Sequence, residues 1–96
     1  MTTRYFVAYD IADPERLRRI HAVVRAFGER VQDSVYELLI TPKERARLEG
    51  RLRAEMNLKE DQVMFIDMGD AARTELREVT TLGLPWAPST RGSVLM

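Results

Sequence analysis

The hydrophobic and polar positions at the start of the chain predict a strand followed by a helix. The first apolar block, residues 5–9, ends on the carboxylate of Asp10, as a short buried strand would. Asp13 and Pro14 then supply an N-cap and a proline at the first helical position. Gly28 is predicted to end the helix as its C-terminal cap. The apolar face of this helix carries Leu17, Ile20, Val24 and Phe27.

A second β-rich stretch covers residues 31–40. Its side chains fall on two faces, but the alternation fails near Ser34. This failure predicts a bulge, or a break into two strand pieces. One face carries Val31, Val35 and Leu39, and the other carries Tyr36, Leu38 and Ile40.

The next elements are a helix, a strand and a second β-like stretch. Thr41 and Glu44 form a capping box around Pro42, so a helix is expected to begin there. Its apolar positions repeat every four residues, and its mixed arginines and glutamates are typical of a solvated face. Residues 62–68 form another buried strand, and residues 76–82 are β-like. The apolar positions of the helix are Leu48, Leu52 and Met56.

This order of elements is βαββαβ with one additional C-terminal strand, which is the α+β ferredoxin-like plan. Two helices cover one face of such a sheet, and a second copy of the chain is expected to cover the other. Residues 1–83 would form the domain. Residues 84–96 would form a tail, with Trp86 and a closing apolar triplet, that docks on a partner.

Length and composition restrict the class of protein. Ninety-six residues make one small domain, and the absence of cysteine excludes disulfides and thiolate metal sites. The N-terminus does not resemble a signal peptide, and no apolar run is long enough to span a membrane, so we expect a cytoplasmic protein. The net charge is zero, which argues against a simple electrostatic nucleic-acid binder. However, residues 14–31 hold five arginines and two acids.

Two positions suggest chemistry from their residue type alone. Asp10 ends a strand just before an arginine-rich helix, where a metal or a phosphate can approach, although aspartate also commonly opens turns. His21 is the single histidine of the chain, so we interpret it as structural or solvated and not as a metal ligand.

Several segments together resemble one known family. The Tyr9-Asp10-Ile11 triplet is followed, eighteen residues later, by the string Gly28-Glu29-Arg30-Val31-Gln32-Asp33-Ser34-Val35-Tyr36-Glu37. Leu39, Thr41, Asp61 and Leu82-Gly83 continue the pattern. In these residues the chain resembles the second core family of CRISPR-associated adaptation proteins, written here Cas-two. The likeness covers residues 4–84.

The resemblance implies a homodimer whose fifth strand joins the partner's sheet. It implies that Asp10 of each subunit binds Mg²⁺ or Mn²⁺ across the twofold axis, with the metal activating water to cleave a phosphodiester. The resemblance also implies action on single-stranded RNA or double-stranded DNA, and a part in spacer acquisition with the Cas-one integrase. The integrase is the alternative docking partner for the tail. The implied nucleic-acid contacts are Arg16, Arg18, Arg19, Arg30, Ser34 and Tyr36.

Other functions stay open at this point. The chain could be a non-catalytic scaffold that binds duplex DNA and the integrase, in which case the arginines matter and Asp10 does not. A remoter alternative is a VapD-like toxin ribonuclease, which shares the fold plan. A ligand-binding ferredoxin-like domain would need a small-molecule pocket, and the sequence shows no sign of one.

Overall fold

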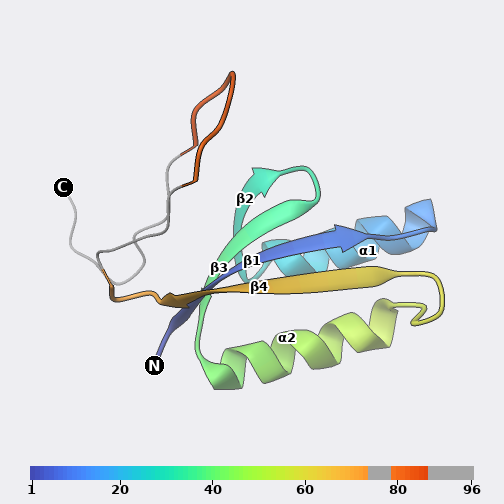
Figure 1. Ribbon diagram of the computed structural model, residues 1–96. Helices are drawn as coiled ribbons and strands as arrows, with labels where there is room; N and C mark the ends of the chain where they lie inside the picture. The colour runs from blue at the N-terminus through green and yellow to red at the C-terminus, as the bar shows by residue number, and fades with distance from the viewer. Residues whose placement is uncertain (74–78, 87–96) are drawn as a thin grey trace.

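A computed structural model of the chain describes residues 1–73 and 79–86. In these residues the elements follow the order β1, α1, β2, β3, α2, β4 (Figure 1). Their bounds are Thr3–Asp10 for β1, Pro14–Arg25 for α1, Gly28–Gln32 for β2, Val35–Ile40 for β3, Pro42–Glu55 for α2 and Gln62–Asp70 for β4. The predicted βαββαβ order is confirmed.

The four strands form one antiparallel sheet in the order β2-β3-β1-β4. Both helices lie against the same face of this sheet (Figure 1). The arrangement is the predicted ferredoxin-like fold. Neither helix in the described part of the chain has the length and apolar character that a membrane span requires.

Local capping signals set where both helices begin. The Asp13 carboxylate accepts a hydrogen bond from the Arg16 backbone N–H at 2.9 Å, and Pro14 occupies the first turn. At α2 the Thr41 hydroxyl accepts from the Glu44 N–H, and the Glu44 carboxylate accepts from the Thr41 N–H. This is the predicted capping box, formed in both directions.

Gly28 has a different role from the predicted helix cap. Helix α1 ends at Arg25, its C-cap is Ala26, and Gly28 is already the first residue of β2. The glycine is required there because a Cβ would lie 2.2 Å from the Glu37 carbonyl oxygen and 2.3 Å from Leu38 Cδ2. The close approach of β2 to β3 therefore explains this residue, and helix termination does not.

Gly28→Ala should destabilise the fold by roughly 2–3 kcal/mol, because a backbone oxygen cannot move aside for the new methyl group. Urea unfolding of the variant and the wild type measures the difference. Gly50→Ala is the matched control: it lies inside α2 with nothing within 4 Å of its Cβ. That variant should gain roughly 0.5–1 kcal/mol from helix propensity. Equal effects of the two substitutions would contradict the packing role of Gly28.

The break predicted near Ser34 is a turn that separates β2 from β3. A register shift between Arg30 and Gln32 accompanies it. The β3 alternation is confirmed on the helix side, where Tyr36, Leu38 and Ile40 are buried. On α1, however, Leu17 is exposed whereas Val23 is buried.

The core lies between the sheet and the two helices. Helix α1 contributes Ile20 and Val24, and α2 contributes Leu48 and Leu52, all fully or almost fully buried. These side chains pack on Val7 and on the inward residues of β3. The helix-facing side of the sheet is therefore closed by the chain's own residues.

The C-terminal part departs from the predicted additional strand. Residues 79–82, where that strand was expected to end, are irregular, and residues 74–78 lie outside the described part. In the described start of the tail, the Trp86 ring packs edge-on against Phe6, with ring centroids 5.3 Å apart. The tail residues 87–96, including the apolar triplet, also lie outside the described part.

Candidate active site at the end of β1

Asp10 lies on the face of the sheet that the helices leave uncovered, called here the open face. On β1 the buried Val7 and Tyr9 point toward the helices, where Tyr9 contacts His21 of α1. Because neighbouring strand residues alternate between faces, Phe6, Ala8 and Asp10 point the opposite way. Asp10 is exposed at the carboxyl end of the strand.

Apolar side chains adjoin Asp10 on the open face. Opposite β1, Met64 pairs with Ala8 and Ile66 pairs with Phe6, so all four side chains share this face. Met64 is 47% exposed and Ile66 42% exposed. An exposed apolar surface of this kind beside a carboxylate is typical of an interaction site.

The carboxylate of Asp10 is available to a ligand. It has no hydrogen-bond or ion-pair partner within residues 1–73 and 79–86. Across the same residues, no three His, Asp or Glu side chains gather into a metal-binding group. Oxygen ligands suit Mg²⁺ and Mn²⁺, so Asp10 fits such a metal by type. One chain supplies a single carboxylate, and a second copy would have to supply another.

Arg16 belongs to a network of ion pairs and hydrogen bonds between the start of α1 and the loop before β4. Its Nε donates to the Asp61 carboxylate at 2.8 Å, and its terminal nitrogen donates to Glu60 at 3.0 Å. The Asp61 side chain is fully buried and also accepts the backbone N–H groups of Ala12 and Asn57. The network fixes the start of α1 to the loop before β4. The Arg16 guanidinium is therefore engaged within the protein and poorly placed to bind phosphate.

This network makes folding stability sensitive to acid. The hydrogen bonds from Arg16 hold the pKa of the Asp61 carboxyl well below its usual range, although burial opposes them. An acid with a depressed folded pKa stabilises the fold above its unfolded pKa of about 3.9. That contribution is lost as pH falls through the folded pKa.

The wild type should therefore lose stability below about pH 4, and Asp61→Asn should remove much of this dependence. Urea midpoints measured from pH 7 to pH 2.5 test the prediction. Asp33→Asn is the control, because that side chain is 91% exposed and pairs with the exposed Arg30. An unchanged acid dependence in Asp61→Asn would show that other carboxylates account for it.

The remaining predicted arginines are exposed at the surface. Arg18 pairs with Glu15, Arg19 with Glu55 and Arg30 with Asp33, at 2.6–2.9 Å. Exposed ion pairs contribute about 0–1 kcal/mol each, so a phosphate can replace the acidic partner at little cost. These three arginines stay candidates for nucleic-acid contact.

The last two predicted nucleic-acid contacts, Ser34 and Tyr36, lie in different surroundings. Ser34 lies in the β2–β3 turn, and its carbonyl oxygen accepts the Tyr9 backbone N–H at 3.1 Å, so this residue adjoins the end of β1. Tyr36 is only 2% exposed and points toward α1. A base cannot stack on a ring in the core, which corrects the expectation for Tyr36. The shared face of Tyr36, Leu38 and Ile40 in the sequence already indicated this burial.

A hydrogen-bonded cluster that the sequence did not predict lies behind Asp10. The His21 ring contacts the hydroxyls of Tyr9 and Tyr36. Burial, with smaller contributions from Tyr36 and Asp33, raises the pKa of Tyr9 to about 12. The Tyr9 hydroxyl therefore stays protonated at neutral pH and can donate a hydrogen bond. The structural interpretation of His21 is confirmed.

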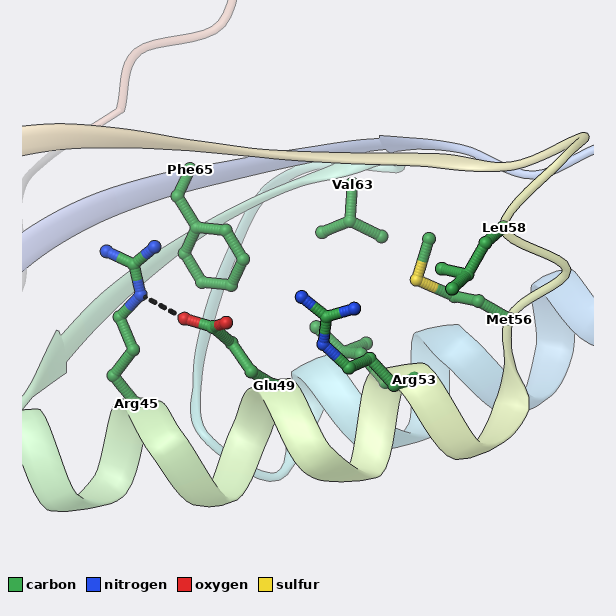
Figure 2. Close-up of a pocket in the computed structure, with 8 residues that line it drawn as sticks. Arg45, Glu49, Arg53, Met56, Leu58, Val63 and Phe65 are labelled. Carbon is green, nitrogen blue, oxygen red and sulfur yellow. Dashed lines mark hydrogen bonds and ion pairs between the residues drawn. The ribbon is translucent and has the colours of Figure 1, made fainter.

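A groove of about 240 Å³ lies elsewhere, between α2 and β4 (Figure 2). Its lining combines the apolar side chains of Leu52, Met56 and Phe65 with the guanidinium groups of Arg45 and Arg53. Arg45 donates to Glu49 at 2.8 Å and stacks on Phe65, 4.3 Å from the ring centroid. Asp10 does not line this groove, so the groove is separate from the candidate active site.

Comparison with known proteins decides the family. The sequence profile described as CRISPR associated protein Cas2 matches residues 2–75. The chain belongs to this Cas2 family. It is 34% identical over 79 residues to the CRISPR-associated endoribonuclease Cas2 1 of Rhodospirillum rubrum, an alignment that covers 82% of this chain and 76% of that protein.

Solved structures agree with the Cas2 assignment. The crystal structure of a hypothetical protein from Thermus thermophilus superposes with a TM-score of 0.78 at 28% identity, covering 93% of this chain and all of that one. Streptococcus pyogenes Cas2 at pH 6.5 gives a TM-score of 0.65 at 30% identity, covering 83% and 99%. The family resemblance seen in the sequence is thus confirmed.

Proposed function

We propose that this Cas2 protein is a dimeric, metal-dependent endonuclease that hydrolyses phosphodiester bonds in single-stranded RNA or double-stranded DNA. The observation that carries the proposal is Asp10, an exposed carboxylate with no hydrogen-bond or ion-pair partner among residues 1–73 and 79–86, beside the exposed apolar side chains of Met64 and Ile66. Relatives that are named endoribonucleases support this reaction class. We place the activity in the cytoplasm.

Dimerisation through the open face completes the proposed site. A second copy would bury Met64 and Ile66, and an isologous twofold contact would bring the two Asp10 side chains toward each other. Two carboxylates in one place can hold Mg²⁺ or Mn²⁺. When bound, the metal supplies Lewis-acid polarisation of the scissile phosphate and a more acidic water.

The chain's own residues bind and orient the substrate in this proposal. Arg18, Arg19 and Arg30 release their exposed acidic partners and hold backbone phosphates, which position nucleic acid without reading its sequence. Arg16 stays with Asp61 and fixes the start of α1. Within the described residues no histidine or lysine makes a hydrogen bond or an ion pair to Asp10 that would mark it as a general base.

The test is a cleavage assay on highly purified full-length chain. Labelled single-stranded RNA and double-stranded DNA are offered with Mg²⁺, with Mn²⁺ or with a chelator, and Asp10→Asn is assayed in parallel. Cutting that requires metal and is lost in Asp10→Asn supports the proposal and identifies the substrate. Cutting that persists in the variant, or no cutting by the wild type, rejects it.

A second candidate is a non-catalytic scaffold that binds duplex DNA and the Cas-one integrase during spacer acquisition. The exposed arginines favour it, since they would serve binding without any reaction. Under this alternative, Arg18→Ala and Arg19→Ala should weaken duplex binding and reduce its salt dependence, whereas Asp10→Asn should leave binding unchanged. Filter binding at several salt concentrations measures this binding, and the cleavage assay on Asp10→Asn separates the two functions.

A further inference from the structure

The single histidine of the chain is held on both sides by tyrosine hydroxyls. His21 Nδ1 lies 2.8 Å from the Tyr9 hydroxyl, and Nε2 lies 3.2 Å from the Tyr36 hydroxyl. Both rings meet the imidazole nearly edge-on. The three side chains come from α1, β1 and β3, so the imidazole joins the helix to two strands of the sheet.

The hydrogen bonds around the imidazole select one arrangement of protons. The Tyr9 hydroxyl donates to the Asp33 carbonyl oxygen at 3.3 Å, so it can accept the proton of His21 Nδ1. Nε2 then carries the lone pair and accepts the hydroxyl proton of Tyr36. This neutral tautomer satisfies all three contacts, whereas the other tautomer would take the Tyr9 proton away from Asp33.

Tyr9 transmits this arrangement to the candidate active site. Its hydroxyl bonds to the carbonyl of Asp33, and its backbone N–H bonds to the carbonyl of Ser34. Both the side chain and the backbone of Tyr9 are thus fixed to the β2–β3 turn, and Asp10 follows Tyr9 directly in the chain. A displacement of the Tyr9 ring would move the backbone that presents Asp10.

We propose that His21 is a positioning residue for Asp10: its imidazole, held between the Tyr9 and Tyr36 hydroxyls, fixes the end of β1 against the β2–β3 turn. The role in catalysis rests on the proposed nuclease function, but the positioning itself does not. His21 touches neither substrate nor metal in this arrangement. It acts through Tyr9.

The positioning is tested first without any catalysis. Amide signals of the ¹⁵N-labelled, metal-free wild type, His21→Leu and His21→Gln are compared by NMR at one pH. In His21→Leu, which removes both hydrogen bonds of the imidazole, the Asp10 and Ser34 amides should move from their wild-type positions. In His21→Gln, which keeps one donor and one acceptor, these changes should be smaller. Changes confined to α1 would overturn the proposal.

Cleavage kinetics then test the consequence at a temperature where every variant is folded. His21→Leu should lower kcat about tenfold with little change in KM, because it displaces the reacting group and not the arginines. His21→Gln should restore part of the loss. Val24→Ala is the control, since it opens the core on the same helix without removing a hydrogen bond to Tyr9. An equal kcat loss in Val24→Ala, or none in His21→Leu, would overturn the proposal.

If the wild type does not cleave, the proposed function fails, and the amide shifts still decide whether His21 positions Asp10.

Discussion

Asp10→Asn should lower metal-dependent cleavage by roughly 100-fold or more. A bound metal contributes several kcal/mol of transition-state stabilisation, and about 1.4 kcal/mol corresponds to a factor of ten in rate. Asparagine has nearly the shape of aspartate but lacks the charge that holds a divalent cation. If the proposed dimer forms with the two Asp10 side chains facing each other, the variant should still dimerise, because the substitution removes a repulsion between carboxylates. Initial rates and sedimentation velocity measure the two expectations.

Asp67→Asn is the matched control for this prediction. Asp67 is also an exposed aspartate at a strand, and its role as acceptor from the Gly69 N–H can be kept by the asparagine carbonyl. Mixed dimers add a sharper test. After equal amounts of wild type and Asp10→Asn exchange subunits, a shared site should leave about a quarter of the activity, whereas independent sites should leave about half. The second result would contradict a metal held across the twofold axis.

The fold was predictable where its causes are local in sequence. Asp13 with Pro14, and Thr41 with Glu44, determine the helix starts through contacts within one turn, and these predictions were correct. The role of Gly28 was not predictable, because it depends on the Glu37 carbonyl nine residues away. The exposure of Leu17 likewise follows from how α1 rotates on the sheet, which helical periodicity alone does not determine.

The candidate site was predictable in position but less so in detail. Asp10 could be placed because a strand that ends on a carboxylate is visible in the sequence. The partner of Arg16 is Asp61, forty-five residues away, so its engagement could not be seen in a local cluster of arginines. The cluster of His21 with two tyrosines forms only because α1, β1 and β3 come together in the fold. The spacing of these residues in the sequence does not predict that contact. A cluster of arginines in the sequence therefore predicts more ligand-binding arginines than the folded protein leaves available.

Arg4→Met should destabilise the protein by roughly 3–5 kcal/mol, which is a large part of the stability of a small domain. Arg4 and Glu37 form an ion pair between β1 and β3, and both are buried, at 8% and 2% exposure. Methionine keeps much of the arginine stem but removes the guanidinium that pairs with Glu37. Removing one charge of a buried pair is expensive because the other charge remains out of water. Urea unfolding at pH 7 gives the difference.

Two further variants separate burial of charge from loss of packing. Arg18→Met removes an arginine from the exposed pair with Glu15 and should cost about 1 kcal/mol or less. The double variant Arg4→Met with Glu37→Leu replaces both buried charges by apolar groups, so it should recover most of the lost stability. A double variant as unstable as Arg4→Met would show that packing, and not the buried negative charge of Glu37, causes the loss. Recovery would mean that Arg4 and Glu37 can be replaced together but not one at a time. Both lie on the open face, where the second copy is proposed to bind.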